Sequence, residues 1–248
     1  MNKDPAYAVI KPHKKIKFRR IILKISGELL GAKDAVFDRA TINYITDQIQ
    51  EVSVLGARIG IVIGGGNIIR GRNAQWFDKI DADLCGMIAT MINGIIINSQ
   101  LAKNHVASKI RGALELHGIV KLFSKSEDLA AFERGQILIF VGGTGNPLFT
   151  TDTAAALRAG ELDADILIKG TKVEGVFARD PVKDPKAILY PKLSFTEVIR
   201  KNLTVMDLAA INICREKNIP ICVYDFLKYP LSSIVRGEKI GTLITNGG

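Results

Sequence analysis

The feature that most constrains this chain is a buried-strand pattern that runs directly into three consecutive glycines, in the segment R-I-G-I-V-I-G-G-G-N-I-I-R-G-R at 58–72. The run I-G-I-V-I is typical of a strand covered on both faces in a parallel sheet. Gly64–Gly66 lack every Cβ, so a ligand can approach the main chain closely. Exposed N–H groups, a helix beginning at Asn67 to Arg70 and the charges of Arg70 and Arg72 would favour phosphate. A tight turn with solvated arginines is the alternative.

The strand-to-glycine pattern recurs elsewhere in the chain. Residues 20–24, 137–141 and 164–169 each predict a buried strand, and glycine and polar residues follow each one. Lysines stand at the ends of the first and third of these strands, at Lys24 and Lys169. The carboxyl ends of parallel strands meet at one edge of a sheet, where α/β proteins bind ligands. The sequence therefore predicts one crevice built from several loops.

The loop after 137–141 differs in character from the loop at Gly64–Gly66. It reads G-G-T-G-N-P-L-F-T-T-D over 142–152 and leads into an alanine-rich helix over 153–159. Hydroxyls and a carboxylate take the place of arginines. This composition suits recognition of a base or sugar better than neutralisation of phosphate.

The sequence excludes several common classes of protein. Counted from Gly64, the sixth residue of a G-x-G-x-x-G pattern would be Ile69, and G-x-x-x-x-G-K-[ST] does not occur, so neither a dehydrogenase nor a P-loop enzyme is supported. The cysteines Cys85, Cys214 and Cys222 form no C-x-x-C pair, which argues against a disulfide framework or zinc site and favours a reducing cytoplasm.

Two helix predictions follow from apolar spacing and charge. Ile42, Ile45, Ile49 and Val52 form a stripe that predicts a helix from an Asp38 cap to Gly56, ahead of the glycine-ended strand. The resulting β-α-β unit favours one large α/β domain.

The second helix covers 84–102, which contains no charge but is interrupted by polar residues such as Thr90 and Asn93. We interpret it as a helix buried nearly all round, capped by Asp83 and placed at a subunit interface, rather than as a membrane span. Residues 1–20 hold no apolar run, so no signal peptide is predicted.

The net charge of +9 is concentrated at the amino terminus. Residues 1–20 hold seven of the 34 Lys and Arg and one of the 25 acidic residues, so the rest of the chain is nearly balanced. We expect residues 1–17 to form a basic, disordered and solvated tail. A nucleic-acid-binding arm is the less favoured interpretation.

Six segments in this order resemble the bacterial uridylate kinases, of the amino-acid kinase fold: K-I-S-G-E, I-G-G-G-N-I-I-R-G, G-T-G-N-P-L-F-T-T-D, T-K-V-E-G-V-F-A-R-D-P, M-D-L-A-A and G-T-L-I-T. The resemblance covers about residues 18 to 246. It implies one domain over 18–248, with an α/β/α sandwich around a mostly parallel sheet. It also implies transfer of the γ-phosphoryl group of ATP to UMP, giving UDP in pyrimidine nucleotide biosynthesis, by a homohexamer that receives Mg²⁺ on ATP.

The resemblance also implies the site residues. The ATP side comprises Lys24, Ile25, Ser26, Gly27, Gly66, Arg70, Thr171, Phe177 and Asp180. The UMP side comprises Gly65, Asp83, Thr144, Gly145, Asn146, Pro147, Leu148, Phe149, Thr150 and Thr151.

Phosphoryl transfer to a phosphate acceptor needs positioning and charge neutralisation rather than a covalent nucleophile or a base. We therefore assign Lys24 and Arg70 to the charge on the transferred group, Lys169 to supporting it, and Asp152 to orienting the lysines.

Three departures from the family pattern are visible: Ala82 replaces a usual glycine, Glu174 replaces a usual aspartate, and the loop at 31–36 is short for an effector loop that would respond to GTP. Related kinases act on carboxylates, carbamate or isopentenyl phosphate, and G-T-G-N-P with T-T-D favours a nucleotide instead. A nucleotide-sensing or nucleic-acid-binding regulator without turnover is the alternative from a different class.

Overall fold

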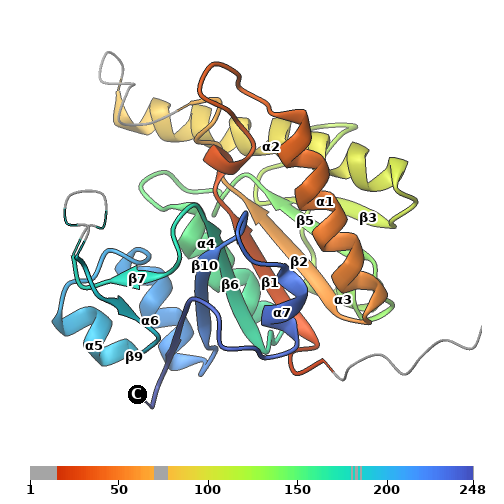
Figure 1. Ribbon diagram of the computed structural model, residues 1–248. Helices are drawn as coiled ribbons and strands as arrows, with labels where there is room; N and C mark the ends of the chain where they lie inside the picture. The colour runs from red at the N-terminus through yellow and green to blue at the C-terminus, as the bar shows by residue number, and fades with distance from the viewer. Residues whose placement is uncertain (1–15, 70–77, 180, 182–183, 185, 248) are drawn as a thin grey trace, which may run out of the picture.

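The computed structural model describes residues 16–69, 78–179, 181, 184 and 186–247. The strands of its main sheet are β1 Arg20–Ile25, β2 Arg58–Ile63, β3 Ser108–Gly112, β4 Lys121–Leu122, β5 Ile137–Val141, β6 Ile166–Thr171, β9 Lys192–Ser194, β10 Ile221–Asp225 and β11 Thr242–Thr245. They lie in the order β4-β3-β5-β2-β1-β6-β10-β11-β9 (Figure 1). Every neighbouring pair is parallel except β10 with β11. The mostly parallel sheet predicted above is confirmed.

Helices cover both faces of this sheet. They are α1 Arg39–Val54, α2 Lys79–Lys103, α3 Lys125–Glu133, α4 Thr151–Glu161, α5 Phe195–Arg200, α6 Leu208–Glu216 and α7 Leu231–Val235, with a 3₁₀ turn η1 at Gly27–Leu29 and a small antiparallel pair, β7 Val176–Phe177 with β8 Leu189–Tyr190. Successive residues of β1 point to opposite faces, so Ile21 and Leu23 pack beneath α1, α2 and α7, whereas Ile22 packs toward α4 and α6. In Figure 1, α1 and α7 lie in front of the sheet and α4 behind it. The three-layer sandwich is therefore confirmed.

The first β-α-β unit forms as its sequence pattern predicts. Asp38 caps α1 by accepting the backbone N–H of Ala40 at 3.3 Å and of Thr41 at 3.2 Å. After the helix, Gly56 adopts φ +93°, a conformation that favours glycine at a helix end. The chain then enters β2, which pairs with β1 over its whole length. The carboxyl ends of β1 and β2 thus lie side by side.

The long apolar helix differs from its prediction at its start. The helix α2 begins at Lys79, and Asp78 caps it by accepting the N–H of Ile80 at 2.7 Å. Asp83 therefore lies within the helix, and the prediction that it is the cap is wrong. Lys79 and Asp81 fit the first turn because they are exposed there.

The prediction that this helix is buried nearly all round is also wrong. Large apolar side chains form an exposed stripe along α2, and Ile88 in its middle is 57% exposed. The stripe comprises Ile80, Leu84, Ile88, Ile92 and Ile95. Among the described residues, α2 is the one helix whose length and composition would allow it to cross a membrane. Its other face packs in the core against α1, β3 and β5.

Two further boundaries differ from expectation. Residues 66–68 form a turn in place of the expected helix start. Ile16 packs against the core and the N–H of Lys17 donates to the carbonyl of Val235 at 2.9 Å, so the body extends back past the expected boundary at 18.

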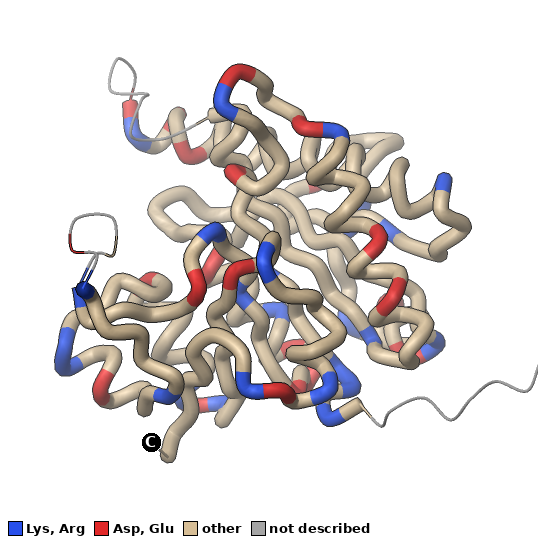
Figure 2. The backbone as a smooth tube through the Cα atoms, viewed as in Figure 1, with Lys and Arg blue, Asp and Glu red and all other residues tan. Residues whose placement is uncertain are grey.

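Charges of both signs are spread along the described chain (Figure 2).

Candidate active site

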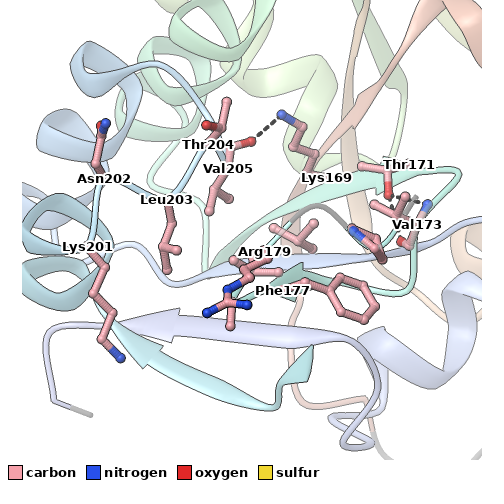
Figure 3. A pocket seen from close by; sticks show the side chains of 15 residues that line it. Lys169, Thr171, Val173, Phe177, Arg179, Lys201, Asn202, Leu203, Thr204 and Val205 are labelled. Atoms are coloured by element: carbon pink, nitrogen blue, oxygen red, sulfur yellow. Dashed lines mark hydrogen bonds between the residues drawn. The ribbon is translucent and has the colours of Figure 1, made fainter. Parts of the chain in front are cut away.

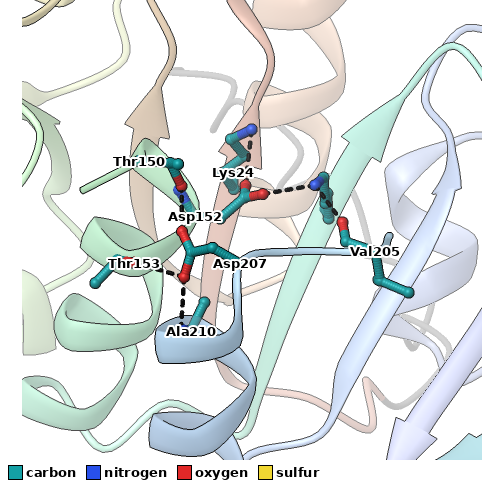
Figure 4. Close-up of polar contacts among 8 residues, drawn as sticks. Lys24, Thr150, Asp152, Thr153, Val205, Asp207 and Ala210 are labelled. Carbon is teal, nitrogen blue, oxygen red and sulfur yellow. Dashed lines mark hydrogen bonds and ion pairs between the residues drawn. The ribbon is translucent and has the colours of Figure 1, made fainter. Parts of the chain in front are cut away.

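One carboxylate joins two lysines at the carboxyl edge of the sheet. Lys24 on β1 and Lys169 on β6 face each other in the paired register of these neighbouring strands. Asp152, in the first turn of α4, forms an ion pair with Lys24 Nζ at 2.8 Å through Oδ1 and with Lys169 Nζ at 2.7 Å through Oδ2 (Figure 4). Lys169 Nζ also donates to the carbonyl of Val205 at 2.5 Å. We call Lys24, Asp152 and Lys169 the charged triad.

Burial and charge act against each other within the charged triad. Burial raises the pKa of Asp152, but the positive charges of Lys24 and Lys169 outweigh it and hold that pKa below its ordinary value. Burial, reinforced by the charge of Lys24, lowers the pKa of Lys169, although Asp152 and Asp207 oppose this change. The carboxylate is therefore ionised at neutral pH. It keeps two cations together where they would otherwise repel.

The predicted phosphate-binding glycines pack against their neighbours with almost no spare space. A Cβ on Gly27 would lie 2.6 Å from both the carbonyl oxygen of Gly64 and the nitrogen of Gly66. A Cβ on Gly65 would lie 2.7 Å from the carbonyl oxygen of Gly86 on α2. Only glycine fits at these two places. The turn after β1, the glycine segment after β2 and helix α2 consequently form one close-packed wall.

A cavity of about 290 Å³ opens beside this wall, and we call it the α2 cavity. Asp83 from α2 and Thr151 from α4 contribute polar atoms to it, and Met87 and Phe149 contribute apolar ones. Its lining comprises Gly65, Gly66, Ile69, Ala82, Asp83, Gly86, Met87, Thr90, Gly143, Phe149, Thr150 and Thr151.

Asp83 has a structural partner in addition to facing the α2 cavity. Its Oδ2 accepts the backbone N–H of Leu148 at 2.8 Å. Leu148 has φ +72°, a left-handed conformation that is costly for a branched side chain. Asp83 therefore holds the 142–150 loop in a strained shape at the mouth of the cavity.

A second cavity, of about 620 Å³, is lined in part by Lys169 of the charged triad, and we call it the β6 cavity (Figure 3). Phe177 contributes an aromatic ring to its lining. Thr171 Oγ1 accepts the N–H of Val173 at 3.1 Å and so shapes the loop that follows β6. The full lining comprises Lys169, Thr171, Val173, Gly175, Val176, Phe177, Ala178, Arg179, Pro181, Lys201, Asn202, Leu203, Thr204, Val205 and Val223.

The structure brings some of the predicted residues to these cavities and places others elsewhere. Thr171 and Phe177 line the β6 cavity, whereas Gly66, expected on the same side, lines the α2 cavity with Gly65. Phe149–Thr151 line the α2 cavity, while Thr144–Leu148 lie outside its lining. The neighbouring positions Ile25, Ser26 and Gly27 form the turn at the end of β1. Arg70, Arg72 and Asp180 lie outside the described residues.

Sequence reasoning missed the supporting role of Asp207, the cap of α6. Its Oδ1 accepts from Thr153 Oγ1 at 2.7 Å and from the N–H of Ala210 at 2.8 Å, and its Oδ2 accepts from Thr150 Oγ1 (Figure 4). Thr150 in turn accepts the N–H of Asp152 at 3.0 Å. Asp207 thereby anchors the start of α4, which carries the triad carboxylate. Its motif M-D-L-A-A was visible in the sequence, but the contact joins segments that lie far apart along the chain.

Glu174, which replaces a usual aspartate, also has a definite partner. It pairs with Lys228, from the segment after β10, and this contact raises the pKa of Lys228. Both side chains are half exposed. The longer glutamate thus joins the loop after β6 to the loop after β10 beside the β6 cavity.

Fold and site together define a class: an α/β protein with a glycine-lined, lysine-bearing site between two cavities at the carboxyl edge of a mostly parallel sheet. Residues 19–225 match the model of the amino acid kinase family. The chain belongs to the amino acid kinase family.

Its relatives share nearly its whole length. A uridylate kinase from Parabacteroides distasonis is 41% identical over 93% of this chain and 99% of its own. A uridylate kinase from Bacteroides thetaiotaomicron is 42% identical over the same shares. The crystal structure of UMP kinase from Bacillus anthracis has a TM-score of 0.90 at 32% identity, covering 93% of this chain and 97% of that one. UMP kinase from Ureaplasma parvum has a TM-score of 0.86 at 35% identity, covering 93% and 100%. The resemblance drawn from the sequence is confirmed.

Proposed function

We propose that this protein is an ATP-dependent UMP kinase, which transfers the γ-phosphoryl group of ATP to UMP and yields UDP and ADP for pyrimidine nucleotide biosynthesis. The observation that carries this proposal is the charged triad between two separate cavities. Its support from relatives is the similarity to uridylate kinases along almost the whole chain. ATP binds in the β6 cavity with its phosphates toward Lys169. UMP binds in the α2 cavity with its phosphate toward Gly65 and Gly66.

The charged triad supplies what this reaction requires. Negative charge on the transferred group and on the leaving phosphate is stabilised by fixed cations in a site of low water content. Lys24 and Lys169 are both less than one-sixth exposed, and Asp152 orients them. The acceptor phosphate is already ionised, so the site needs no general base. Arg70 and Asp180 retain their assignments to the ATP side from the family pattern.

Mg²⁺ fits this site as part of the ATP complex. The described residues contain no group of three or more His, Cys, Asp or Glu side chains arranged to hold a metal. Both oxygens of Asp152 are already paired with lysines. The donor set therefore fits a cation held by phosphate oxygens and water, which is the arrangement that Mg²⁺ prefers.

The enzyme assembles into a homo-oligomer, for which the family pattern suggests a hexamer. The α2 stripe supports self-association, because contiguous exposed apolar side chains are typical of a protein interface. Replacing Ile88 with Asp should shift the assembly toward smaller species in sedimentation velocity. Replacing Val54 with Asp, at a position 68% exposed on α1, is the control and should leave the assembly unchanged.

The cytoplasm is the compartment that suits this activity. The described cysteines are free, and burial raises the pKa of the Cys214 and Cys222 thiols to about 12. Unpaired thiols are typical of proteins from reducing compartments.

The decisive experiment measures phosphoryl transfer by the purified protein with ATP and each nucleoside monophosphate. Formation of UDP from UMP at a rate far above the other acceptors is expected. Turnover of a different acceptor alone would overturn the choice of UMP. Nucleotide binding without any turnover would favour the regulator, which the kinase relatives do not favour.

A further inference from the structure

Two asparagines form a closed hydrogen-bonded unit behind the glycine wall. Asn93 lies on α2 and is 0% exposed. Its Nδ2 donates to the carbonyl of Gly64 at 2.7 Å and to Asn67 Oδ1 at 2.7 Å. Asn67 Nδ2 donates back to Asn93 Oδ1 at 3.1 Å and to the carbonyl of Val36 at 3.0 Å. Because the Gly64 carbonyl can only accept, the amide of Asn93 has one permitted orientation.

Burying polar amides on the core face of a helix costs stability unless they are hydrogen-bonded, so the partners of this amide pair indicate its role. An amide buried without partners destabilises a protein by several kcal/mol in an apolar environment. Asn93 avoids that cost by bonding the backbone of the glycine segment, which has no side chains of its own to hold it. Three successive glycines have the largest backbone freedom of any tripeptide. Their single conformation must be fixed from outside.

The amide pair fixes this conformation at the point where the glycine segment lines the α2 cavity. The peptide between Gly64 and Gly65 is planar, so holding the Gly64 carbonyl also fixes the direction of the Gly65 N–H. The contacts of Gly27 and Gly65 described above leave the segment almost no room to adjust. Asn93 itself lines neither the α2 cavity nor the β6 cavity.

We propose that Asn93 and Asn67 are positioning residues for phosphoryl transfer, which hold Gly64–Gly66 in the orientation that the acceptor phosphate requires. The inference rests on the proposed function. It predicts a loss of turnover rather than of nucleotide binding, because misplacement of reacting groups by about 1 Å lowers the rate by up to about 100-fold.

The test compares Asn93→Ala and Asn93→Asp with Asn98→Ala. Asn98 lies on the same helix and accepts from Ser108 Oγ at 2.9 Å, away from both cavities. Asn93→Asp keeps the shape of the side chain and removes the donor, which separates the lost hydrogen bond from an added void. Both Asn93 variants should lower kcat by about 10-fold to 100-fold, with KM for each nucleotide within about threefold of wild type. Asn98→Ala should keep kcat within about twofold.

Two further measurements address folding and coupling. Asn67 is only partly buried, so Asn67→Ala should disturb folding less than a change at Asn93. It therefore tests the amide pair even if an Asn93 variant does not fold. If the two residues act as one unit, the double alanine variant should lose no more kcat than the worse single variant. Equal kcat in Asn93→Ala and Asn98→Ala, or a rise in KM with kcat unchanged, would overturn the proposal.

Amide hydrogen exchange separates this inference from the proposed function. Peptides that contain 64–67 should exchange faster in Asn93→Ala and at the wild-type rate in Asn98→Ala. A wild-type protein that fails to phosphorylate UMP refutes the proposed function alone. Unchanged exchange in Asn93→Ala refutes the positioning role whatever the acceptor is.

Discussion

Replacing Asp152 with Asn is the sharpest test of the charged triad, because it removes one charge and leaves two buried cations. At separations of 2.7–2.8 Å, each lysine–carboxylate pair is worth roughly 6 kcal/mol at an effective dielectric constant of about 20, before desolvation is subtracted. The variant can escape part of this loss by deprotonating one lysine. Lys169 is the first to lose its proton, since burial already lowers its pKa.

Deprotonation of one lysine sets an upper limit on the stability that Asp152→Asn can lose. Deprotonating a lysine of ordinary pKa at pH 7 costs roughly 5 kcal/mol. The free energy of unfolding should therefore fall by about 3–5 kcal/mol, in the range found when one partner of a buried pair is removed. UMP phosphorylation should fall by about 100-fold or more, because the lysines lose both orientation and charge.

The pH dependence distinguishes this mechanism from simple loss of packing. In Asp152→Asn, the folded state holds a neutral Lys169 while the unfolded state holds a protonated one. The unfolded state then binds more protons, so the stability of the variant rises with pH, by up to about 1.4 kcal/mol per unit. Urea unfolding of variant and wild type between about pH 6 and about pH 9 measures this slope.

Asp128→Asn is the matched control. Asp128 is 1% exposed and both its carboxylate oxygens lie 2.7 Å from Arg111 Nε, far along the chain from the triad. Arginine does not deprotonate in proteins, so this variant should lose stability without the upward slope and should keep its kinase activity. A stability difference for Asp152→Asn that does not change with pH would refute the charge assignment.

Four further results are expected. Initial rates with each nucleoside monophosphate should give a kcat/KM for UMP far above that for CMP, because a site built for one base edge leaves polar groups unpaired with another; comparable values would refute the UMP assignment. Lys24→Ala should lower kcat by about 100-fold or more in steady-state assays. Asp83→Asn should raise KM for UMP by about tenfold and leave KM for ATP unchanged. Because asparagine still accepts the Leu148 N–H, this rise would report a lost contact with the ligand. An unchanged KM for UMP would show that Asp83 serves only the loop contact. Deletion of residues 1–15 should preserve UMP phosphorylation, because the core contacts of the described chain begin at Ile16; loss of activity with intact assembly would show that the deleted segment reaches the site.

Local patterns predicted the parts of the molecule that depend on local physics. The strands that end in glycine were recognisable from their short β-branched runs. Glycine follows them because another backbone approaches too closely there to leave room for a Cβ, as at Gly27 and Gly65. Asp38 was recognisable as the cap of α1, because it stands just ahead of the apolar stripe of that helix. The triad lysines could be placed at strand ends. Their shared carboxylate, Asp152, was assigned from the charge requirements of phosphoryl transfer, after the family resemblance had suggested that reaction.

Contacts between distant segments could not be predicted in the same way. The Asn67–Asn93 pair joins residues 26 positions apart, and the contact of Thr150 with Asp207 spans 57. Neither contact has a local signature in the sequence. A polar interruption of an apolar helix accounts for Asn93, and a helix cap accounts for Asp207, without reference to a distant partner. The start of α2 was misplaced because the absence of charge in 84–102 marks the apolar part of a helix rather than its first turn.

The separation of the two cavities has a consequence for the order in which substrates bind. The α2 cavity and the β6 cavity share no lining residue, since one is built by the segments up to Thr151 and the other by the segments from Lys169 onward. With ATP assigned to the β6 cavity and UMP to the α2 cavity, as proposed, neither nucleotide has to complete the binding place of the other. UMP and a non-hydrolysable ATP analogue should each bind alone in calorimetry, and product-inhibition kinetics should follow a random sequential scheme. Under such a scheme, the rate in a cell would respond to both nucleotide pools without one controlling access of the other.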